Sequence, residues 1–167
     1  MDYQIIPITL DHVKGFHAAV DSVARERKYL AFLEGPPLQM SYDFVKENIE
    51  GGWPQVVAIS NDKVIGWCDI SSLHRQSYAH CGELGVGVLK EFRGQGIGEA
   101  LMRAALDKAK QKGLTRIELS VFESNHGAAL LYHKLGFEVE GKKKKAVRID
   151  GKYEDLICMA LLFDDIS

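Results

Sequence analysis

A glycine-dense loop in the middle of the chain sets the tightest limit on what the chain can fold into. Residues 93–98 read Arg-Gly-Gln-Gly-Ile-Gly, between an apolar strand at 84–89 and a long amphipathic helix. Such a loop leaves backbone N–H groups uncovered, and the positive end of the helix dipole lies at the same place. The arrangement predicts a seat for phosphate groups. A glycine-rich turn that binds nothing is the alternative.

Two common phosphate-binding motifs do not fit the loop. A P-loop needs Lys and then Ser or Thr after its last glycine, whereas Glu99 follows Gly98. A dinucleotide fingerprint needs a glycine at the sixth position from Gly94, in an early strand–helix–strand unit, and that position is again Glu99. The pattern Q/R-x-x-G-x-G/A does fit, with Arg93, Gly96 and Gly98 at its fixed positions.

The bulk properties narrow the class of protein. A chain of 167 residues can bury one core, so we expect a single domain over 1–167. With 46% hydrophobic and 26% charged residues, it is typical of a soluble globular protein. A net charge of −2 argues against a nucleic-acid partner held by bulk positive charge. The sequence has no signal-peptide pattern and no apolar run of about 20 residues, so we expect no membrane association.

The three cysteines indicate the compartment. Cys68, Cys81 and Cys158 are odd in number and lie in apolar, strand-like runs. We interpret them as free thiols in a reducing cytoplasm. Since no cysteines or histidines share ligand spacing, we expect no metal site.

Hydrophobic periodicity predicts the order β-α-α-β-β-β-α-β-α-β-β. This order favours an α+β sheet with helices on both faces. The expected strands are 3–8, 56–59, 64–70, 83–89, 116–121, about 137–140 and 156–163, and the last two flank a basic turn at 142–145. The expected helices begin near Thr9 or Asp11, at Ser41, at Gly96 and at Asn125.

A second motif lies at 125–137, Asn-His-Gly-Ala-Ala-Leu-Leu-Tyr-His-Lys-Leu-Gly-Phe. Asn125 is suited to cap a helix, and Tyr132 lies two turns along the same face, so both side chains can point at one groove. A simple cap and a core aromatic residue are the alternatives.

Together the loop at 93–98, the N-x-x-A-x-x-L-Y-x-K-x-G-F segment at 125–137 and the element order resemble the GNAT family of acyl-CoA-dependent N-acyltransferases, along the whole chain. The resemblance implies a central mixed, mostly antiparallel sheet that splays at its fourth and fifth strands. It also implies acetyl-CoA as the acyl donor. Homodimers are common among relatives, and the oligomeric state stays open.

The resemblance also implies which residues bind the cofactor. They are the strand that receives the pantetheine arm, the diphosphate loop and the start of the next helix: Val86, Gly87, Val88, Arg93, Gly94, Gln95, Gly96, Ile97, Gly98, Asn125 and Tyr132. Glycines within a strand mark a bulge or a close approach, and a bulge at Gly85 or Gly87 would splay this strand from the next. Close packing of a helix is the alternative.

Tyr132 and Glu83 are the candidate catalytic residues. Tyr132 matches the family tyrosine beside the CoA sulfur, so we predict that it is the general acid. Glu83 begins the strand before the loop, where several small-molecule members carry a glutamate, so we predict a base that acts through water. An exposed structural glutamate is the alternative. Some protein-acetylating relatives place the base at the position of Ser120, which serine cannot replace.

We therefore predict acetyl transfer from acetyl-CoA to a primary amine of a small molecule, such as an amino acid, a polyamine or a xenobiotic amine. A protein N-terminus or lysine is the second hypothesis, and a non-catalytic acyl-CoA sensor is the third. In the family the region at 25–29 walls the acceptor site, and its mixed charge suggests a polar, zwitterionic acceptor. Trp67 could add an aromatic wall.

Overall fold

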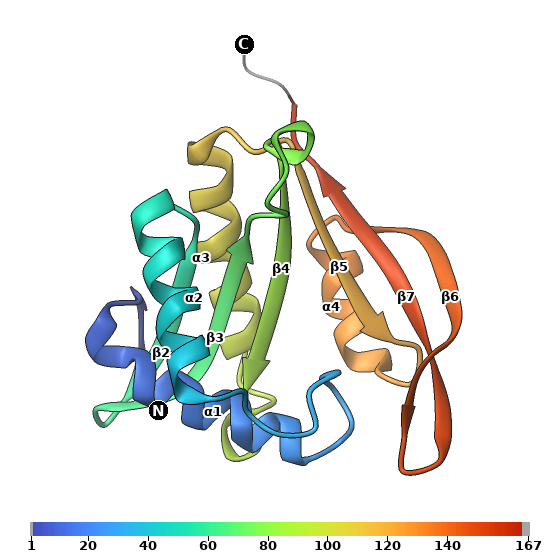
Figure 1. The fold of residues 1–167 in the computed structure, drawn as a ribbon, viewed down its shortest axis with the longest axis horizontal. Helices are drawn as coiled ribbons and strands as arrows, with labels where there is room; N and C mark the ends of the chain where they lie inside the picture. The colour runs from blue at the N-terminus through green and yellow to red at the C-terminus, as the bar shows by residue number, and fades with distance from the viewer. Residues whose placement is uncertain (1, 165–167) are drawn as a thin grey trace.

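A seven-stranded sheet forms the centre of the computed structural model, which describes residues 2–164 (Figure 1). The strand order is β1-β2-β3-β4-β5-β7-β6. The strands are β1 (Gln4–Pro7), β2 (Gln55–Ser60), β3 (Lys63–Ser71), β4 (Cys81–Val88), β5 (Arg116–Phe122), β6 (Glu138–Ile149) and β7 (Lys152–Leu162). The helices are α1 (Val13–Arg25), α2 (Leu38–Gly51), α3 (Ile97–Lys112) and α4 (His126–Lys134), with short 3-10 turns at Leu10–His12, Gln76–Tyr78 and Lys90–Phe92.

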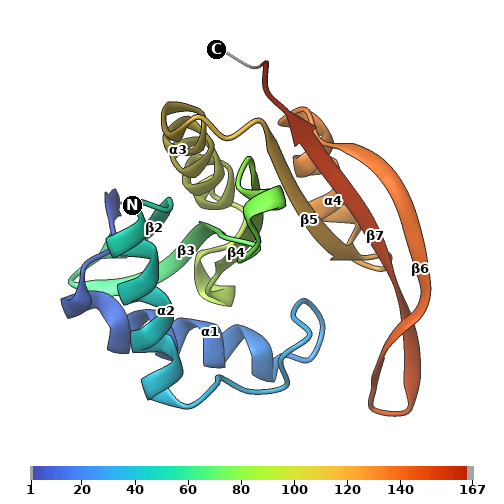
Figure 2. The ribbon, with the colours of Figure 1, turned by 45° about the horizontal axis from the view of Figure 1, so that its top comes forward.

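The sheet opens between β4 and β5, as the family resemblance implies. These two strands form the one parallel pair among the described residues, and they pair only from Cys81 with Arg116 to Glu83 with Glu118. All other neighbouring strands are antiparallel. Beyond Glu83 the two strands diverge, and Figure 2 shows β5 and β7 leaning away from β3 and β4. The opening leaves the C-terminal half of β4 without a strand partner on that side.

Helices cover both faces of the sheet. In Figures 1 and 2, α1 and α2 lie over one face, while α3 and α4 lie behind the other. The core between these layers consists of apolar side chains with almost no exposure, including Val13, Ile65, Leu101, Met102 and Ile117. None of the helices in the described part of the chain is long and apolar enough to cross a bilayer.

The predicted helix ends are partly confirmed. Gly113, in the left-handed region at φ 93°, ends α3, and Asn125 caps α4 through a hydrogen bond that the Ala128 N–H donates. The prediction for Ser41 was wrong. Ser41 is buried within α2, which begins three residues earlier, after Pro37. Proline fixes its own backbone in a conformation that can precede the first helical turn, and this signal outweighed the serine.

The basic run at 142–145 is also not a turn. It belongs to β6, a strand of 12 residues that pairs with β7, and the turn lies at Asp150 and Gly151. The strand is exposed over most of its length, so it shows no apolar alternation, although lysines are common on exposed edge strands. Lys142 donates to Glu123 at 2.6 Å, and Lys145 lies over the ring of Tyr153.

Candidate active site

A cavity of about 530 Å³ lies beside the opening between β4 and β5. It is bounded by β4, by the loop before α3 and by the start of α4. Its lining includes ten of the eleven residues for which the sequence predicts cofactor binding: Val86, Gly87, Val88, Arg93, Gly94, Gly96, Ile97, Gly98, Asn125 and Tyr132. Gln95 is exposed and lies outside this lining. We call this space the loop-side cavity.

The glycine loop has the geometry of an anion seat. Gly94 and Gly96 adopt φ values of 77° and 80°, where side chains are strained, and a Cβ at either position would meet nothing within 4 Å. The space above the loop is therefore open to a ligand. Gly96 is also the N-cap of α3, whose first-turn N–H groups have no partner within the helix. Gly98 is in ordinary helical conformation and has room for a Cβ. A diphosphate fits this arrangement.

The side chain of Arg93 is held by other residues of the protein and is not free to bind a phosphate group. Its Nε donates to the Val88 carbonyl at 2.9 Å, and its guanidinium forms a bidentate ion pair with Glu26. The same group lies 4.7 Å from the centre of the Tyr29 ring. The hydrogen bonds from Arg93 lower the pKa of Glu26 below its ordinary value. Arg93 thus ties the loop to β4 and to the end of α1.

The glycines of β4 do not form a bulge, so that expectation was wrong. Pairing with β3 is continuous along the strand, and each of the two glycines lies opposite a large or charged side chain. A Cβ on Gly87 would overlap the Trp67 indole, and one on Gly85 would lie 3.2 Å from Asp69 Oδ1. The glycines therefore make room for side chains of the neighbouring strand. The sheet splays because β4 and β5 stop pairing after Glu83.

Tyr132 and Asn125 do face one space, as their two-turn separation predicts. The Tyr132 side chain is only 8% exposed, next to Phe137. Burial, with a smaller contribution from Cys68, raises the pKa of the Tyr132 hydroxyl well above its ordinary value. This hydroxyl stays protonated at neutral pH, which is the state that a proton donor needs.

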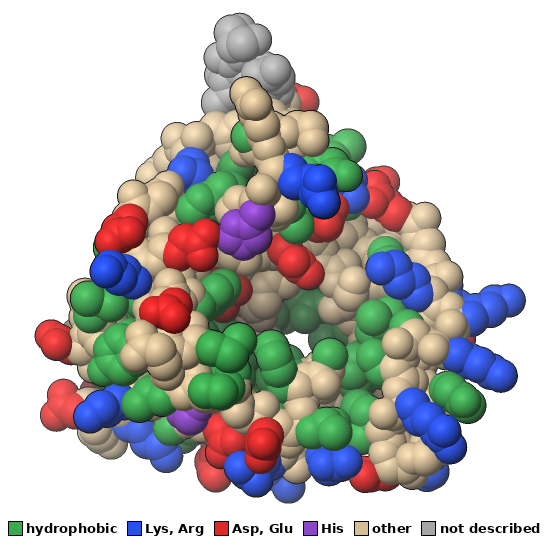
Figure 3. Space-filling model, in the orientation of Figure 1, with side chains coloured by type: hydrophobic (Ala, Val, Ile, Leu, Met, Phe, Trp, Pro, Cys, Tyr) green, Lys and Arg blue, Asp and Glu red, His purple; other side chains and the backbone are tan. Residues whose placement is uncertain are grey.

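A second cavity of about 430 Å³ lies on the α1 and α2 side of the sheet, and we call it the helix-side cavity. It shares one lining residue, Val86, with the loop-side cavity. Its walls are mostly aromatic and aliphatic. The Phe16 ring packs against Phe44 and against Trp67, with ring centroids 6.4 and 6.1 Å apart. Figure 3 shows this face hollowed at its centre, with hydrophobic side chains around the opening.

Asp69, which is not among the residues predicted from the sequence, lines the helix-side cavity together with Glu83. Asp69 is 8% exposed, and its pKa is raised to about 7 by burial and by the Glu83 charge. The signal was present in the sequence. Asp69 is the one charged residue in the run Val64–Ile70, and an acidic residue within a buried strand is rare unless it is paired.

The structure separates some residues that the sequence analysis groups together. Glu83 is exposed and lines the helix-side cavity, whereas Tyr132 lines the loop-side cavity, and Val86 is the lining residue that the two cavities share. Tyr29, which was expected in the acceptor wall, lies against Arg93 in the loop-side cavity. Trp67 lies in the helix-side cavity, as an aromatic wall there would require.

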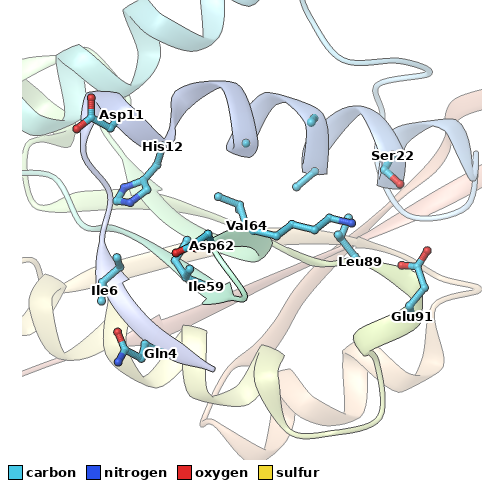
Figure 4. A pocket seen from close by; sticks show the side chains of 14 residues that line it. Gln4, Ile6, Asp11, His12, Ser22, Ile59, Asp62, Val64, Leu89 and Glu91 are labelled. Atoms are coloured by element: carbon cyan, nitrogen blue, oxygen red, sulfur yellow. The ribbon is translucent and has the colours of Figure 1, made fainter. Parts of the chain in front are cut away.

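Another hollow, of about 660 Å³, lies between α1 and the ends of the first three strands (Figure 4). Asp11 and His12 lie at one end of it, with Ser22 and Glu91 at the other. It contains none of the candidate site residues. Among residues 2–164, no three His, Cys, Asp or Glu side chains cluster closely enough to hold a metal ion.

Known proteins share this sequence pattern and this fold. A family model described as Acetyltransferase (GNAT) family matches residues 19–137. An L-amino acid N-acetyltransferase of Escherichia coli (strain K12) is 34% identical over 110 residues, which are 65% of this chain and 68% of that protein. A ribosomal protein bS18 alanine N-acetyltransferase of Haemophilus influenzae is 26% identical over 136 residues, 81% of this chain and 90% of that protein.

The similarity of fold covers a larger share of the chain than the similarity of sequence. The structure of a Salmonella typhimurium protein, solved with its cofactor acetyl-CoA, superposes with a TM-score of 0.93 at 18% identity. The match covers 100% of this chain and 97% of that one. The family model covers most of the chain, including the glycine loop and the segment that contains Tyr132. The chain is an enzyme that belongs to the GNAT family of N-acetyltransferases.

Proposed function

We propose that this enzyme transfers an acetyl group from acetyl-CoA to the primary amine of a small molecule, within a ternary complex. The observation that carries the proposal is that Val86, on the open edge of β4, lines both the loop-side and the helix-side cavity. A donor in the first cavity and an amine in the second would meet there without crossing the sheet. We further propose that residues 1–167 form a single N-acetyltransferase domain, since one sheet runs through the described residues.

In this proposal the loop-side cavity holds acetyl-CoA. Main-chain N–H groups between Arg93 and Gly98 bind the diphosphate, and the free edge of β4 from Val86 to Val88 pairs with the pantetheine arm in the manner of an added strand. The remaining predicted contacts, at Asn125 and Tyr132, line the same space. Acetyl-CoA supplies an acetyl group activated as a thioester.

Two side chains of the protein then transfer protons during the reaction, one as an acceptor and one as a donor. An alkylammonium has a pKa near 10, so it must lose a proton before its nitrogen can attack. Glu83 accepts this proton through water. The nitrogen forms a bond to the carbonyl carbon, the carbon–sulfur bond breaks, and the Tyr132 hydroxyl donates its proton to the departing sulfur. The nitrogen then loses its excess proton as the neutral amide forms, and this proton returns Tyr132 to its protonated state. Main-chain N–H groups on β4 stabilise the negative charge that develops on the carbonyl oxygen.

A protein acceptor is the second candidate, and the Haemophilus influenzae relative named for alanine acetylation favours it. Ser120 argues against it, because a hydroxyl cannot replace the base that some protein-acetylating relatives carry at this position. Thiol release from acetyl-CoA, measured against amines, amino acids and short peptides, tests the proposal. We expect release that depends on a small amine. Release with peptides alone would favour the protein acceptor, and coenzyme A binding without release would favour a sensor.

A further inference from the structure

The charged residues that line the helix-side cavity indicate which kind of acceptor this cavity can bind. Its two charged lining residues, Asp69 and Glu83, are both acidic, and no Lys, Arg or His is among its lining residues. The other polar lining residues are the hydroxyls of Ser41 and Ser71. A small-molecule site of this kind uses apolar walls for affinity and a few polar groups for orientation. Here the orienting charge is negative.

Asp69 lies where it can serve a ligand. Its side chain is buried, and within the described residues no ion pair or hydrogen bond reaches its carboxylate. A buried charge without a partner is unfavourable, so this carboxylate would gain from a cation that enters the cavity. Gly85, directly opposite on β4, has no side chain to cover it. The carboxylate is thus held at the cavity wall without a partner from the protein.

The arginine at the neighbouring end of the sheet is already engaged. Arg116, which pairs with Cys81 across β4 and β5, donates to Glu118 at 3.1 Å and to Glu140 at 2.7 and 2.9 Å. Its guanidinium is therefore not free to receive a carboxylate from a ligand. An amino acid in the helix-side cavity would place its own carboxylate beside two acidic groups and against apolar walls, which is unfavourable for a charge.

We infer that the acceptor is a primary amine with an apolar body and no carboxylate, and that Asp69 binds its ammonium group. The inference rests on the proposed function and narrows its acceptor. The aromatic rings around Trp67 receive the apolar body, and their faces also attract a cation. Glu83, at the exposed end of the cavity, keeps the role of proton acceptor. Asp69 acts as the specificity-determining residue.

Matched acceptors test the inference. Phenethylamine and L-phenylalanine differ only in the carboxylate, and we expect kcat/KM at least about tenfold higher for phenethylamine. A preference for L-phenylalanine or for peptides would overturn the inference.

A pair of variants tests the role of Asp69. D69N keeps the shape of the side chain and removes its charge, so we expect KM for phenethylamine to rise at least about tenfold, with a smaller change in kcat and an unchanged Kd for coenzyme A. The matched control D62N changes an exposed aspartate in the β2–β3 turn, where Asn tolerates the φ of 60°. An unchanged KM in D69N, or an equal rise in D62N, would contradict the assignment.

Direct binding separates this inference from the proposed function. Calorimetry with phenethylamine and the coenzyme A-bound protein needs no turnover. Binding that D69N weakens, in the absence of any thiol release, would support the acceptor site and reject the proposed catalysis. Absence of phenethylamine binding to a protein that acetylates other amines would reject the acceptor site and retain the catalysis.

Discussion

Glu26 at the end of α1 and Arg93 in the glycine loop form a bidentate ion pair, although 67 positions separate them in the chain. The Nη1–Oε1 and Nη2–Oε2 distances are 2.8 and 2.6 Å, and both side chains are mostly shielded from solvent. The pair fixes one end of the loop whose N–H groups are expected to hold the diphosphate. It therefore links the orientation of α1 to the geometry of the proposed cofactor site.

The variant E26Q tests this link. We expect it to lower the free energy of unfolding by about 1 kcal/mol and to weaken coenzyme A binding several-fold, because the loop loses one of its anchors. Chemical denaturation and calorimetry measure the two effects. The matched control is D150N, which removes the more exposed pair between Arg27 and Asp150. Equal losses of stability and of coenzyme A affinity in E26Q and D150N would show that shielding the Glu26–Arg93 pair from solvent affects neither quantity.

The ion pair between Glu26 and Arg93 makes the stability of the folded protein depend on pH, and the direction of this dependence follows from the pKa of Glu26. Arg93 depresses the pKa of Glu26 in the folded protein, so the pair stabilises fully above the ordinary glutamate pKa of about 4.3. This stabilisation is lost as the pH falls through the depressed folded value. The difference in stability between the natural protein and E26Q should shrink in acid.

Two glycines in the loop are expected to respond differently to alanine. Gly96 has a φ of 80°, so G96A introduces backbone strain of roughly 1 kcal/mol and moves the N–H groups at the start of α3. Gly98 is helical, and the side-chain atoms nearest to the place of an added methyl group lie 3.8 and 3.9 Å away, so G98A fits and favours the helix. Coenzyme A affinity should fall in G96A and stay within about threefold in G98A. The reverse order would contradict the role given to the loop.

Removal of the Tyr132 hydroxyl is expected to affect the rate and spare binding. Y132F should lower kcat by a factor of about 10² or more, with little change in the Kd for coenzyme A, because the ring still fills its place next to Phe137. Steady-state kinetics and calorimetry separate the two quantities. Y153F, at an exposed tyrosine of β7, is the control and should match the natural protein. A normal kcat in Y132F would remove the tyrosine from the acid role.

Loss of the Glu83 carboxylate is expected to matter most at low pH. The acceptor is then almost fully protonated, so the rate depends most on assisted removal of its proton. In E83Q, the ratio of natural to variant kcat/KM should therefore rise as the pH falls from about 9 to about 6. E50Q, on the exposed part of α2, provides the control. A ratio that does not vary with pH would assign Glu83 a structural role.

The element order and the loop-side cavity could be predicted because their signals are local. A glycine that must adopt positive φ, as at Gly96 and Gly113, and a cap such as Asn125 act within one turn of the chain. Such signals depend little on distant packing. The splay between β4 and β5 followed from the family resemblance, and the structure confirms it.

The features that were missed depend on neighbours distant in the sequence. Gly85 and Gly87 are explained by the side chains opposite them on β3, and a strand register cannot be read from β4 alone. Asp69 became a candidate only when the register placed it on the same cavity as Glu83. The long β6 strand was hidden because an exposed strand has little apolar alternation to detect.

Calorimetric titration of the folded protein with coenzyme A, compared with pantetheine, tests the central claim most directly. Pantetheine lacks the diphosphate that the N–H groups between Arg93 and Gly98 should hold. We expect coenzyme A to bind with a Kd between about 1 μM and 1 mM, and pantetheine to bind at least about tenfold more weakly. Equal affinity for the two ligands, or no coenzyme A binding at millimolar concentration, would contradict the account.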